Sequence, residues 1–267
     1  MTLTHHPRTD KPFLFDPAVL LARAEASREA YRDADPFPHG VFDDFVPEEV
    51  VDGLLEEFPS PRDLDWQSFR AEQEVKLATN DGEDMGPLTR HMIAQFQSPA
   101  LLQFLETLTG IEGLIPDPYL TGGGLHQIER GGFLNVHADF NWCNKLKLHR
   151  RVNLIFYLNR DWKEEYGGHL ELWDKPMKNC RARVLPIANR AAIFSTTSTS
   201  WHGHPDPLTC PEGNSRKSIA FYYYTADRPR HEKHGRHTTI FRSRPGDAAK
   251  NPNGSWLQRM IAPFRGQ

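Results

Sequence analysis

The sequence predicts an α+β protein in which several helices precede an antiparallel β unit. Two observations support this fold class. Up to residue 115 the chain contains amphipathic segments that begin at prolines, a pattern typical of helices. From residue 116 to residue 225 it consists of short alternating or β-branched runs separated by glycine, proline and asparagine. Several short strands at this spacing indicate a sandwich or barrel.

The N-terminal part is predicted to form four helices and one short strand. Asp16 followed by Pro17 is a good helix start, because aspartate can cap the helix and proline suits its first turn. The stretch 60–85 is polar and irregular, so we expect a surface loop there. The expected helices cover residues 17–34, 47–58, 87–96 and 99–109, and the expected strand covers residues 41–45.

The β unit is predicted from runs that cover residues 118–129, 133–139, 151–158, 169–173, 181–186, 190–195 and 217–225. We therefore divide the chain into three regions within one structural domain. Residues 1–115 form an N-terminal helical support and loop region packed on the core, residues 116–225 the β core, and residues 226–267 a basic C-terminal tail.

The net charge is close to neutral overall but uneven along the chain. The 32 basic and 35 acidic side chains give a charge of −3 at pH 7, which argues against a dedicated nucleic-acid binder. The tail 226–267 carries +6 and the rest of the chain −9, so contact of the tail with an anionic partner stays open. Within the tail, SWLQRMIAPF at 255–264 is predicted to form a short helix that docks on the domain.

The sequence favours a cytoplasmic protein. No run approaches the ~18 apolar residues of a membrane span, so no membrane partner is expected. The N-terminus lacks the apolar core of a signal peptide. The three cysteines lie far apart without a CxxC pair, which disfavours a disulfide framework and a zinc knuckle. The sequence does not indicate an oligomeric state.

A candidate metal site lies in GGFLNVHADFNW at residues 131–142. On a strand, His137 and Asp139 project from the same face, about 7 Å apart. Either His202 or His204 in WHGHP, which follows the predicted strand 190–195, can supply a third ligand. Two histidines and one carboxylate on one face of a metal ion are typical of non-haem Fe(II) oxygenases. An H-x-D pair by itself also occurs in chains that bind no metal.

A candidate anion site follows this histidine motif. Arg216 opens the run RKSIAFYYYT, and Arg216 and Ser218 lie on one face of the predicted strand. A guanidinium beside a hydroxyl suits a carboxylate, which it can bind through two parallel hydrogen bonds. A metal triad and an anion site would then share one small barrel.

Four blocks of sequence resemble the Fe(II)/2-oxoglutarate-dependent dioxygenases, specifically the prolyl-4-hydroxylase-like branch. They are GGFLNVHADF, NLIFYLNRDWKEEYGGHLELW, WHGHPDP and RKSIAFYYYT, in the family's order over residues ~120–225. The second block is the most specific, because YLN-x-DW precedes GG-x-L-x-L. The segment PFPHGVFDDFVPEEVVDGLLEEF is similar to the entry segment of bacterial members. The resemblance implies a double-stranded β-helix (jelly-roll/cupin-like) core with N-terminal supporting helices.

The resemblance implies that His137, Asp139 and His202 are the catalytic metal ligands and bind Fe(II). His202 is favoured over His204 because family members commonly have glycine directly after the distal histidine, and Gly203 stands there. The retained carboxylate favours hydroxylation, since halogenating relatives have glycine or alanine in its place.

For the cosubstrate, the resemblance implies that Arg216 and Ser218 bind the distal carboxylate of 2-oxoglutarate, helped by Tyr157. Asn153 matches another position of the same pocket. A tyrosine that family members often place nine or ten residues before the first metal histidine is missing, and Gln127 stands there beside His126.

The implied reaction uses 2-oxoglutarate and O2, releases succinate and CO2, and hydroxylates an unactivated C–H bond. The expected partner is a small-molecule or peptidyl substrate: prolyl, amino-acid-like or a small metabolite. Ascorbate is a further candidate cofactor. The loop 60–85 and the basic tail are expected to face the substrate because they lie outside the four blocks.

Two other functions stay open at this point. One is a zinc-dependent hydrolase with the same triad, although no positioned glutamate base stands nearby. The other is a non-catalytic binding module on a decayed barrel. Two further histidine-containing stretches, KLKLHRR at 145–151 and RHEKHGRH at 230–237, are expected to be a solvated loop and a basic surface segment.

Overall fold

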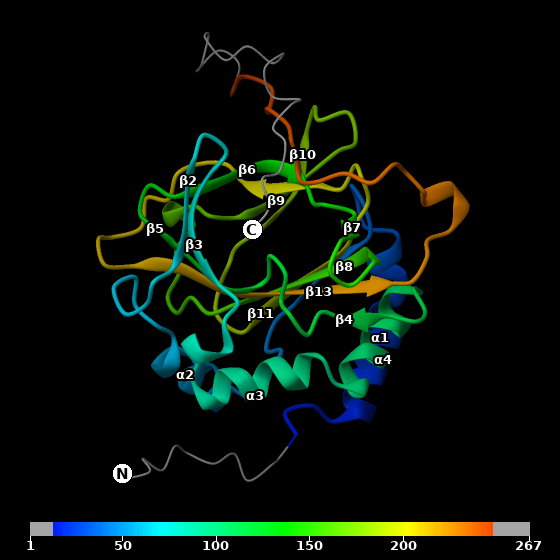
Figure 1. Cartoon of the computed structure of the whole chain (residues 1–267), viewed down its shortest axis with the longest axis horizontal. Helices are drawn as coiled ribbons and strands as arrows, with labels where there is room; N and C mark the ends of the chain where they lie inside the picture. Colours follow the sequence, from blue (N-terminus) through cyan, green and yellow to red (C-terminus); the bar gives the residue numbers. More distant parts are fainter. Residues whose placement is uncertain (1–12, 248–267) are drawn as a thin grey trace.

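The computed structural model describes residues 13–247 (Figure 1), so the helix expected at 255–264 lies outside the described residues. It confirms the four expected helices. The N-terminus of α1 is capped by Asp16, whose carboxylate accepts hydrogen bonds from the backbone N–H groups of Ala18 and Val19. The helices are α1 (Pro17–Arg32), α2 (Glu48–Glu57), α3 (Pro87–Phe96) and α4 (Pro99–Thr109).

The β unit is a nearly closed antiparallel barrel. Its strands are β1 (His39–Phe42), β2 (Gln67–Ala71), β3 (Glu74–Thr79), β4 (Ile115–Pro116), β5 (Gly124–Glu129), β6 (Phe133–Ala138), β7 (Trp142–Cys143), β8 (Leu148–Tyr157), β9 (Leu170–Trp173), β10 (Cys180–Val184), β11 (Arg190–Ser195), β12 (Trp201–His204), β13 (Ser215–Thr225) and β14 (Ile240–Phe241). Hydrogen bonding connects them in the order β1-β11-β8-β13-β5-β3-β6-β12-β9-β10.

The barrel has two facing walls, which is the arrangement of a jelly roll. In Figure 1, β8, β11 and β13 form the lower wall, β6, β9 and β10 the upper wall, and β3 and β5 join them on the left. The walls touch across the interior, since the rings of Phe194 on β11 and His202 on β12 have centroids 4.6 Å apart. The expected jelly-roll core with supporting helices is therefore confirmed.

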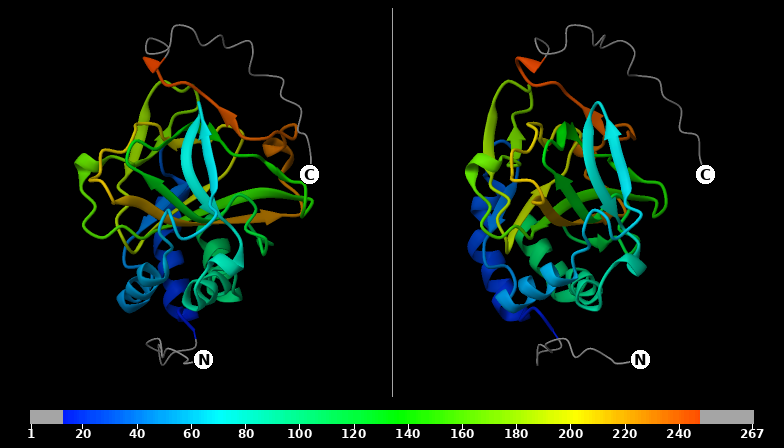
Figure 2. Two further views of the ribbon diagram at one scale, coloured as in Figure 1. Left: turned by 60° about the vertical axis from the view of Figure 1, so that its left-hand side comes forward. Right: turned by 90° about the vertical axis from the view of Figure 1, so that its left-hand side faces the viewer.

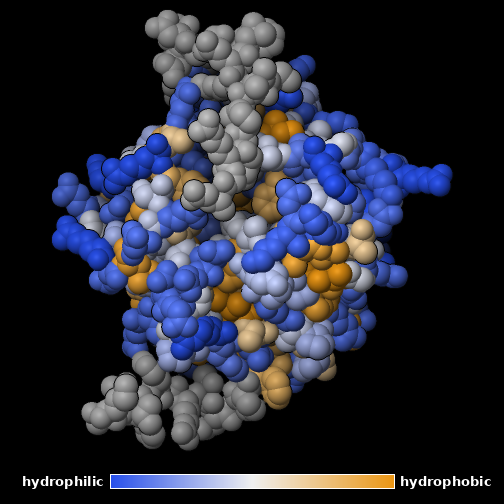
Figure 3. All heavy atoms as spheres, viewed as in Figure 1, coloured by the Kyte–Doolittle hydropathy of each residue, from blue (hydrophilic) through white to orange (hydrophobic). Residues whose placement is uncertain are grey.

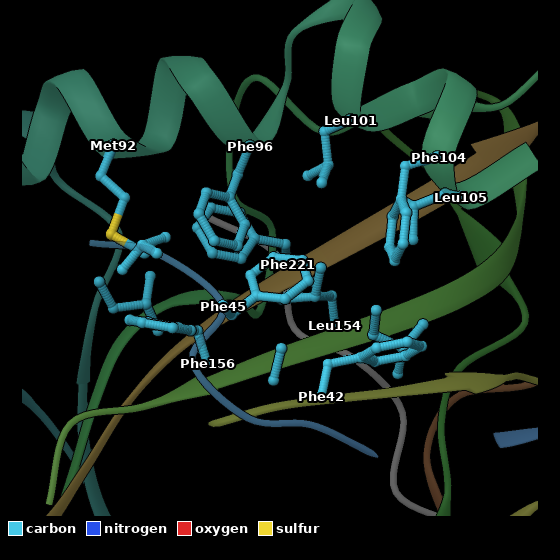
Figure 4. Close-up of a cluster of buried hydrophobic side chains, with 14 of the residues drawn as sticks. Phe42, Phe45, Met92, Phe96, Leu101, Phe104, Leu105, Leu154, Phe156 and Phe221 are labelled. Atoms are coloured by element: carbon cyan, nitrogen blue, oxygen red, sulfur yellow. The ribbon is translucent and has the colours of Figure 1, made fainter. Parts of the chain in front are cut away.

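The helices pack against the outer face of the β8–β13 wall (Figure 2), and the β2–β3 hairpin lies on the other side of that wall. Figure 4 shows side chains of α3 and α4 meeting those of the strands. Phe96 stacks on Phe221 with ring centroids 4.6 Å apart. Burying one such side chain stabilises the fold by about 1.5–3 kcal/mol, so this layer anchors the wall that forms the floor of the barrel.

Alternation along β13 separates the helix-facing residues from those that face the barrel interior. Ile219, Phe221 and Tyr223 belong to the core shared with the helices. Arg216, Ser218, Ala220 and Tyr222 instead line an interior cavity. The predicted common face of Arg216 and Ser218 is thus confirmed.

The prediction of a loop at 60–85 is wrong in the central part of this stretch. Residues 67–79 form the β2–β3 hairpin, and β3 pairs with both β5 and β6. Few apolar residues alternate there, so the sequence pattern does not indicate strands. The hairpin forms because the backbone of β3 satisfies the hydrogen-bonding groups of two neighbouring strands.

Two other expectations need correction. The stretch 145–151 is only partly a loop, since β8 begins at Leu148 and the side chains of Arg150 and Arg151 are buried. Their charges are balanced by Asp139 and Glu232, which makes burial possible. The histidines of WHGHP belong to a strand of their own, β12, which was not predicted.

The surface seen in Figure 3 is mostly hydrophilic, with hydrophobic residues in separate areas. Within residues 13–247, no helix combines the length and the apolar character that crossing a membrane requires.

Candidate metal and anion site in the barrel

The interior of the barrel contains a cavity of about 280 Å³. Strands from both walls line it, and the β2–β3 hairpin and β14 contribute further side chains, among them Phe69, Lys76 and Phe241. Residues from the stretch 60–85 and from the described part of the tail therefore line the cavity.

Three potential metal ligands meet in this cavity. His137 lies on β6, Asp139 directly follows it, and His202 lies on β12 opposite His137 in the antiparallel pairing. One donor atom from each of the three lies within 4.8 Å of the others. Imidazole nitrogen and carboxylate oxygen suit Fe(II) and other divalent transition metals, so the donor set fits a metal ion.

Backbone carbonyls orient both imidazoles. The Nδ1 atom of His137 lies 2.9 Å from the carbonyl oxygen of Asn135, and that of His202 lies 2.9 Å from the carbonyl oxygen of Ser200. A carbonyl can only accept, so Nδ1 carries the proton in each ring and Nε2 is left with a free lone pair. Both Nε2 atoms lie 3.4–3.6 Å from the Asp139 carboxylate. The two rings are thus prepared to bind a metal through Nε2.

The carboxylate of Asp139 is held from its other side. Asn153 donates from Nδ2 to Oδ2 at 2.7 Å, and Arg150 Nη2 lies 3.0 Å from the same oxygen. Burial opposes ionisation of Asp139, but the Arg150 guanidinium outweighs it and holds the pKa of Asp139 well below its ordinary value. Asp139 is therefore a carboxylate at neutral pH.

Sequence reasoning missed Arg150. Simple alternation from Asn153, which lines the cavity, places Arg150 on the opposite face of β8. The β8–β13 register shifts between Tyr223 and Tyr224, so that Arg150 pairs with Tyr224 and one extra residue is accommodated. This β-bulge turns Arg150 into the cavity, where its guanidinium lies 3.4 Å from the ring centroid of Tyr222. No sequence signal marks the bulge.

Gly203 sets the distance between β12 and β6. A Cβ atom at this position would lie 2.8 Å from the carbonyl oxygen of Leu134 and 2.9 Å from that of Asn135. Only glycine allows this approach, and the same contact places His202 beside His137. His204 lies in the same cavity but does not belong to the three-residue ligand group.

Arg216 forms the other polar end of the cavity. Its Nε donates to the carbonyl oxygen of Gly168 at 2.8 Å and its Nη2 to the Tyr157 hydroxyl at 3.2 Å. A Cβ on Gly168 would come within 2.9 Å of the arginine side chain, so glycine makes room for it. Burial lowers the pKa of Arg216, and no carboxylate of the described residues forms an ion pair with it. A buried guanidinium without a carboxylate partner fits an anionic ligand.

The other residues expected at the cosubstrate site have distinct positions. Ser218 lines the cavity next to Arg216 on β13. Tyr157 is fully buried, and its hydroxyl accepts a hydrogen bond from Arg216. Asn153 lines the cavity but donates to Asp139, and its Oδ1 accepts from Arg150.

The comparison with protein families matches the part of the chain that contains these site residues. Residues 123–224 match the profile of the 2OG-Fe(II) oxygenase superfamily. The chain is 26% identical over 214 residues to the mouse prolyl 3-hydroxylase OGFOD1, covering 76% of this chain and 35% of the relative. It thus spans about a third of that relative's length.

Two solved structures share the fold. A Pseudomonas putida prolyl-4-hydroxylase superposes with a TM-score of 0.55 at 16% identity, covering 77% of this chain and 98% of that one. A Trichoplax adhaerens prolyl hydroxylase in complex with a hypoxia-inducible-factor peptide fragment gives 0.50 at 14% identity, covering 78% and 90%. The sequence match to the 2OG-Fe(II) oxygenase superfamily thus lies in the β core, residues 123–224, and the two solved structures share the fold of this chain.

Proposed function

We propose that this protein is an Fe(II)- and 2-oxoglutarate-dependent dioxygenase that hydroxylates an unactivated C–H bond. One observation supports this most strongly: a His-Asp-His group and a buried arginine without a carboxylate partner among the described residues share one cavity. The first suits a divalent metal and the second suits the distal carboxylate of a 2-oxo acid.

In this proposal His137, Asp139 and His202 hold Fe(II). The bound metal supplies the activation of O2 that is coupled to decarboxylation of 2-oxoglutarate to succinate and CO2. The backbone carbonyls of Asn135 and Ser200 keep the imidazoles in the metal-binding tautomer. The protein positions the metal and the cosubstrate, and the reaction requires no separate general base.

The cosubstrate is oriented by Arg216 and Ser218 through its distal carboxylate. Tyr157 supports this by fixing the guanidinium, since its hydroxyl accepts from Nη2. Apolar side chains, among them Ile128, Leu134 and Leu170, also line the cavity and provide surface for the methylene groups of the cosubstrate.

For the substrate we propose a prolyl residue, with free amino acids and small metabolites of similar size as alternatives. The mouse relative's name supports a prolyl substrate. The rings of Phe69, Phe140, Tyr222 and Phe241 line the cavity and suit a compact apolar ring. We also propose ascorbate as an accessory reductant and, from the cysteine usage, a cytoplasmic location.

The test is release of succinate from 2-oxoglutarate, followed by NMR, with Fe(II) and candidate prolyl peptides or amino acids. Wild-type protein should release succinate, more so with the right substrate and with ascorbate present. His137→Ala should abolish release, while His39→Ala, on the outer strand β1, should retain it. Substrate hydrolysis without 2-oxoglutarate, or Fe(II) binding without turnover of any 2-oxo acid, would contradict the proposal.

A further inference from the structure

His204 is a buried histidine for which the proposed reaction has no role. Its side chain is 4% exposed and lines the cavity. Neither Nδ1 nor Nε2 has a hydrogen-bond partner among residues 13–247. Buried polar groups are nearly always paired, and each unpaired one costs about 1–3 kcal/mol. The two ring nitrogens therefore indicate a ligand that the described part of the chain does not supply.

The metal does not account for this side chain. The β12–β6 register shifts between His202, which pairs with His137, and His204, which pairs with Leu134. The two histidines lie two residues apart on β12 and both line the cavity, but only the first belongs to the ligand group. His204 thus lies farther along the cavity wall.

The charged and titratable groups that influence the pKa of His204 come from four strands, β3, β5, β6 and β13. Burial is the largest cause of the lowered pKa of His204; among the charged groups Arg216 contributes most, followed by Lys76, His137 and His126. Lys76 forms an ion pair with Glu74 at 3.0 Å. Arg216 has no such partner among the described residues. His204 therefore lies near an arginine whose positive charge no carboxylate of the described residues neutralises.

We propose that His204 is a further contact for 2-oxoglutarate and donates from a ring nitrogen to the carboxylate that Arg216 and Ser218 bind. An imidazole has at least one N–H donor in either protonation state. A carboxylate has about four lone-pair positions and can accept from a guanidinium, a hydroxyl and an imidazole together. This inference rests on the proposed function, since it concerns the same cosubstrate.

The experiment compares two ligands on Mn(II)-loaded protein without oxygen, so that binding is measured apart from turnover. 2-Oxoglutarate and 2-oxopentanoate share the metal-binding end, but only the first has a distal carboxylate. Calorimetry gives the Kd of each for wild type, His204→Leu, His204→Gln and the distant control His39→Leu. Mn(II) affinity is measured in parallel and reports whether the triad is intact.

We expect His204→Leu to weaken 2-oxoglutarate binding about tenfold or more, as for loss of a hydrogen bond to a charged group. Its affinity for 2-oxopentanoate should not change, and His204→Gln, which keeps an N–H donor, should recover most of the loss. Equal weakening of both ligands, or an unchanged 2-oxoglutarate affinity in His204→Leu, would overturn the inference.

Wild-type protein supplies a readout that does not depend on the folding of a variant. In the Zn(II)-loaded protein, adding 2-oxoglutarate should protect one histidine ring N–H from exchange in ¹⁵N NMR spectra, and 2-oxopentanoate should not. Absence of that signal would count against His204. If wild type binds neither ligand, the proposed function itself fails, whereas normal binding with no effect of His204 removes only the inference.

Discussion

Arg150 and Asp139 form an ion pair inside the barrel, with Arg150 Nη2 3.0 Å from Asp139 Oδ2. Arg150 is 1% exposed, and its guanidinium lies over Tyr222 and Phe140. Asn153 donates to the same carboxylate oxygen. Because Arg150 and Asn153 both engage Oδ2, Oδ1 is the oxygen left for a metal ion.

Replacing Arg150 should weaken metal binding. We expect Arg150→Gln to lower Fe(II) or Mn(II) affinity about 10-fold to 100-fold, the usual effect of removing a group that orients a metal ligand. The pKa of Asp139 should also rise towards its ordinary value, because burial would no longer be opposed by a guanidinium. Metal titration of both proteins at pH 7 tests this. Arg150→Lys keeps the charge and should lose less; unchanged affinity in the glutamine variant would refute the role.

A methyl group at position 203 should separate the two metal-binding strands. In Gly203→Ala the new Cβ would lie within 3 Å of two carbonyl oxygens on β6, so β12 must shift and carry His202 away from His137. We expect at least tenfold weaker metal binding, on the order of the cost of one misplaced ligand. Gly235→Ala is the matched control, since nothing lies within 4 Å of its Cβ position. Equal metal affinity in the two variants would show that the close approach does not position His202.

The helix layer should dominate the stability of the barrel wall. Phe96 is fully buried and stacks on Phe221, so Phe96→Ala should lower the free energy of unfolding by about 3–5 kcal/mol. Urea denaturation measures this. Phe13 is 68% exposed, so Phe13→Ala should lower the free energy of unfolding by less than about 0.5 kcal/mol. A small loss at Phe96 would mean that the wall is stable without the helices.

His126 should make the metal-free protein less stable in acid. Burial, with the positive charges of Lys76 and Arg216, lowers the pKa of His126 to about 3. Its ordinary value is 6.5, so the unfolded chain binds this proton at a higher pH than the folded protein does. The contribution to stability is complete above pH 6.5 and is lost as the pH falls towards 3. Between pH 7.5 and pH 5, the free energy of unfolding of His126→Gln should therefore fall less than that of wild type. Urea denaturation at the two pH values measures this. An equal fall in both proteins would show that His126 does not cause the acid sensitivity.

Sequence alone determined the features that depend on local pattern. Capping at Asp16 and prolines at helix starts predicted all four helices, because these signals act within a few residues. Alternation predicted that Arg216 and Ser218 share a face, and the H-x-D spacing predicted that His137 and Asp139 lie together. Side chains two residues apart on a regular strand share a face wherever that strand packs.

Tertiary structure decided what depends on contacts between distant segments. The strand β3 exists because it pairs with β5 and β6, although its own pattern is that of a polar loop. Arg150 enters the cavity through a β-bulge in the pairing of β8 with β13. A shift of one residue reverses which face a side chain occupies, and strand register depends on partners far away in the chain. Ligand types could therefore be recognised from the sequence, while the residues that orient them became visible only in the folded barrel.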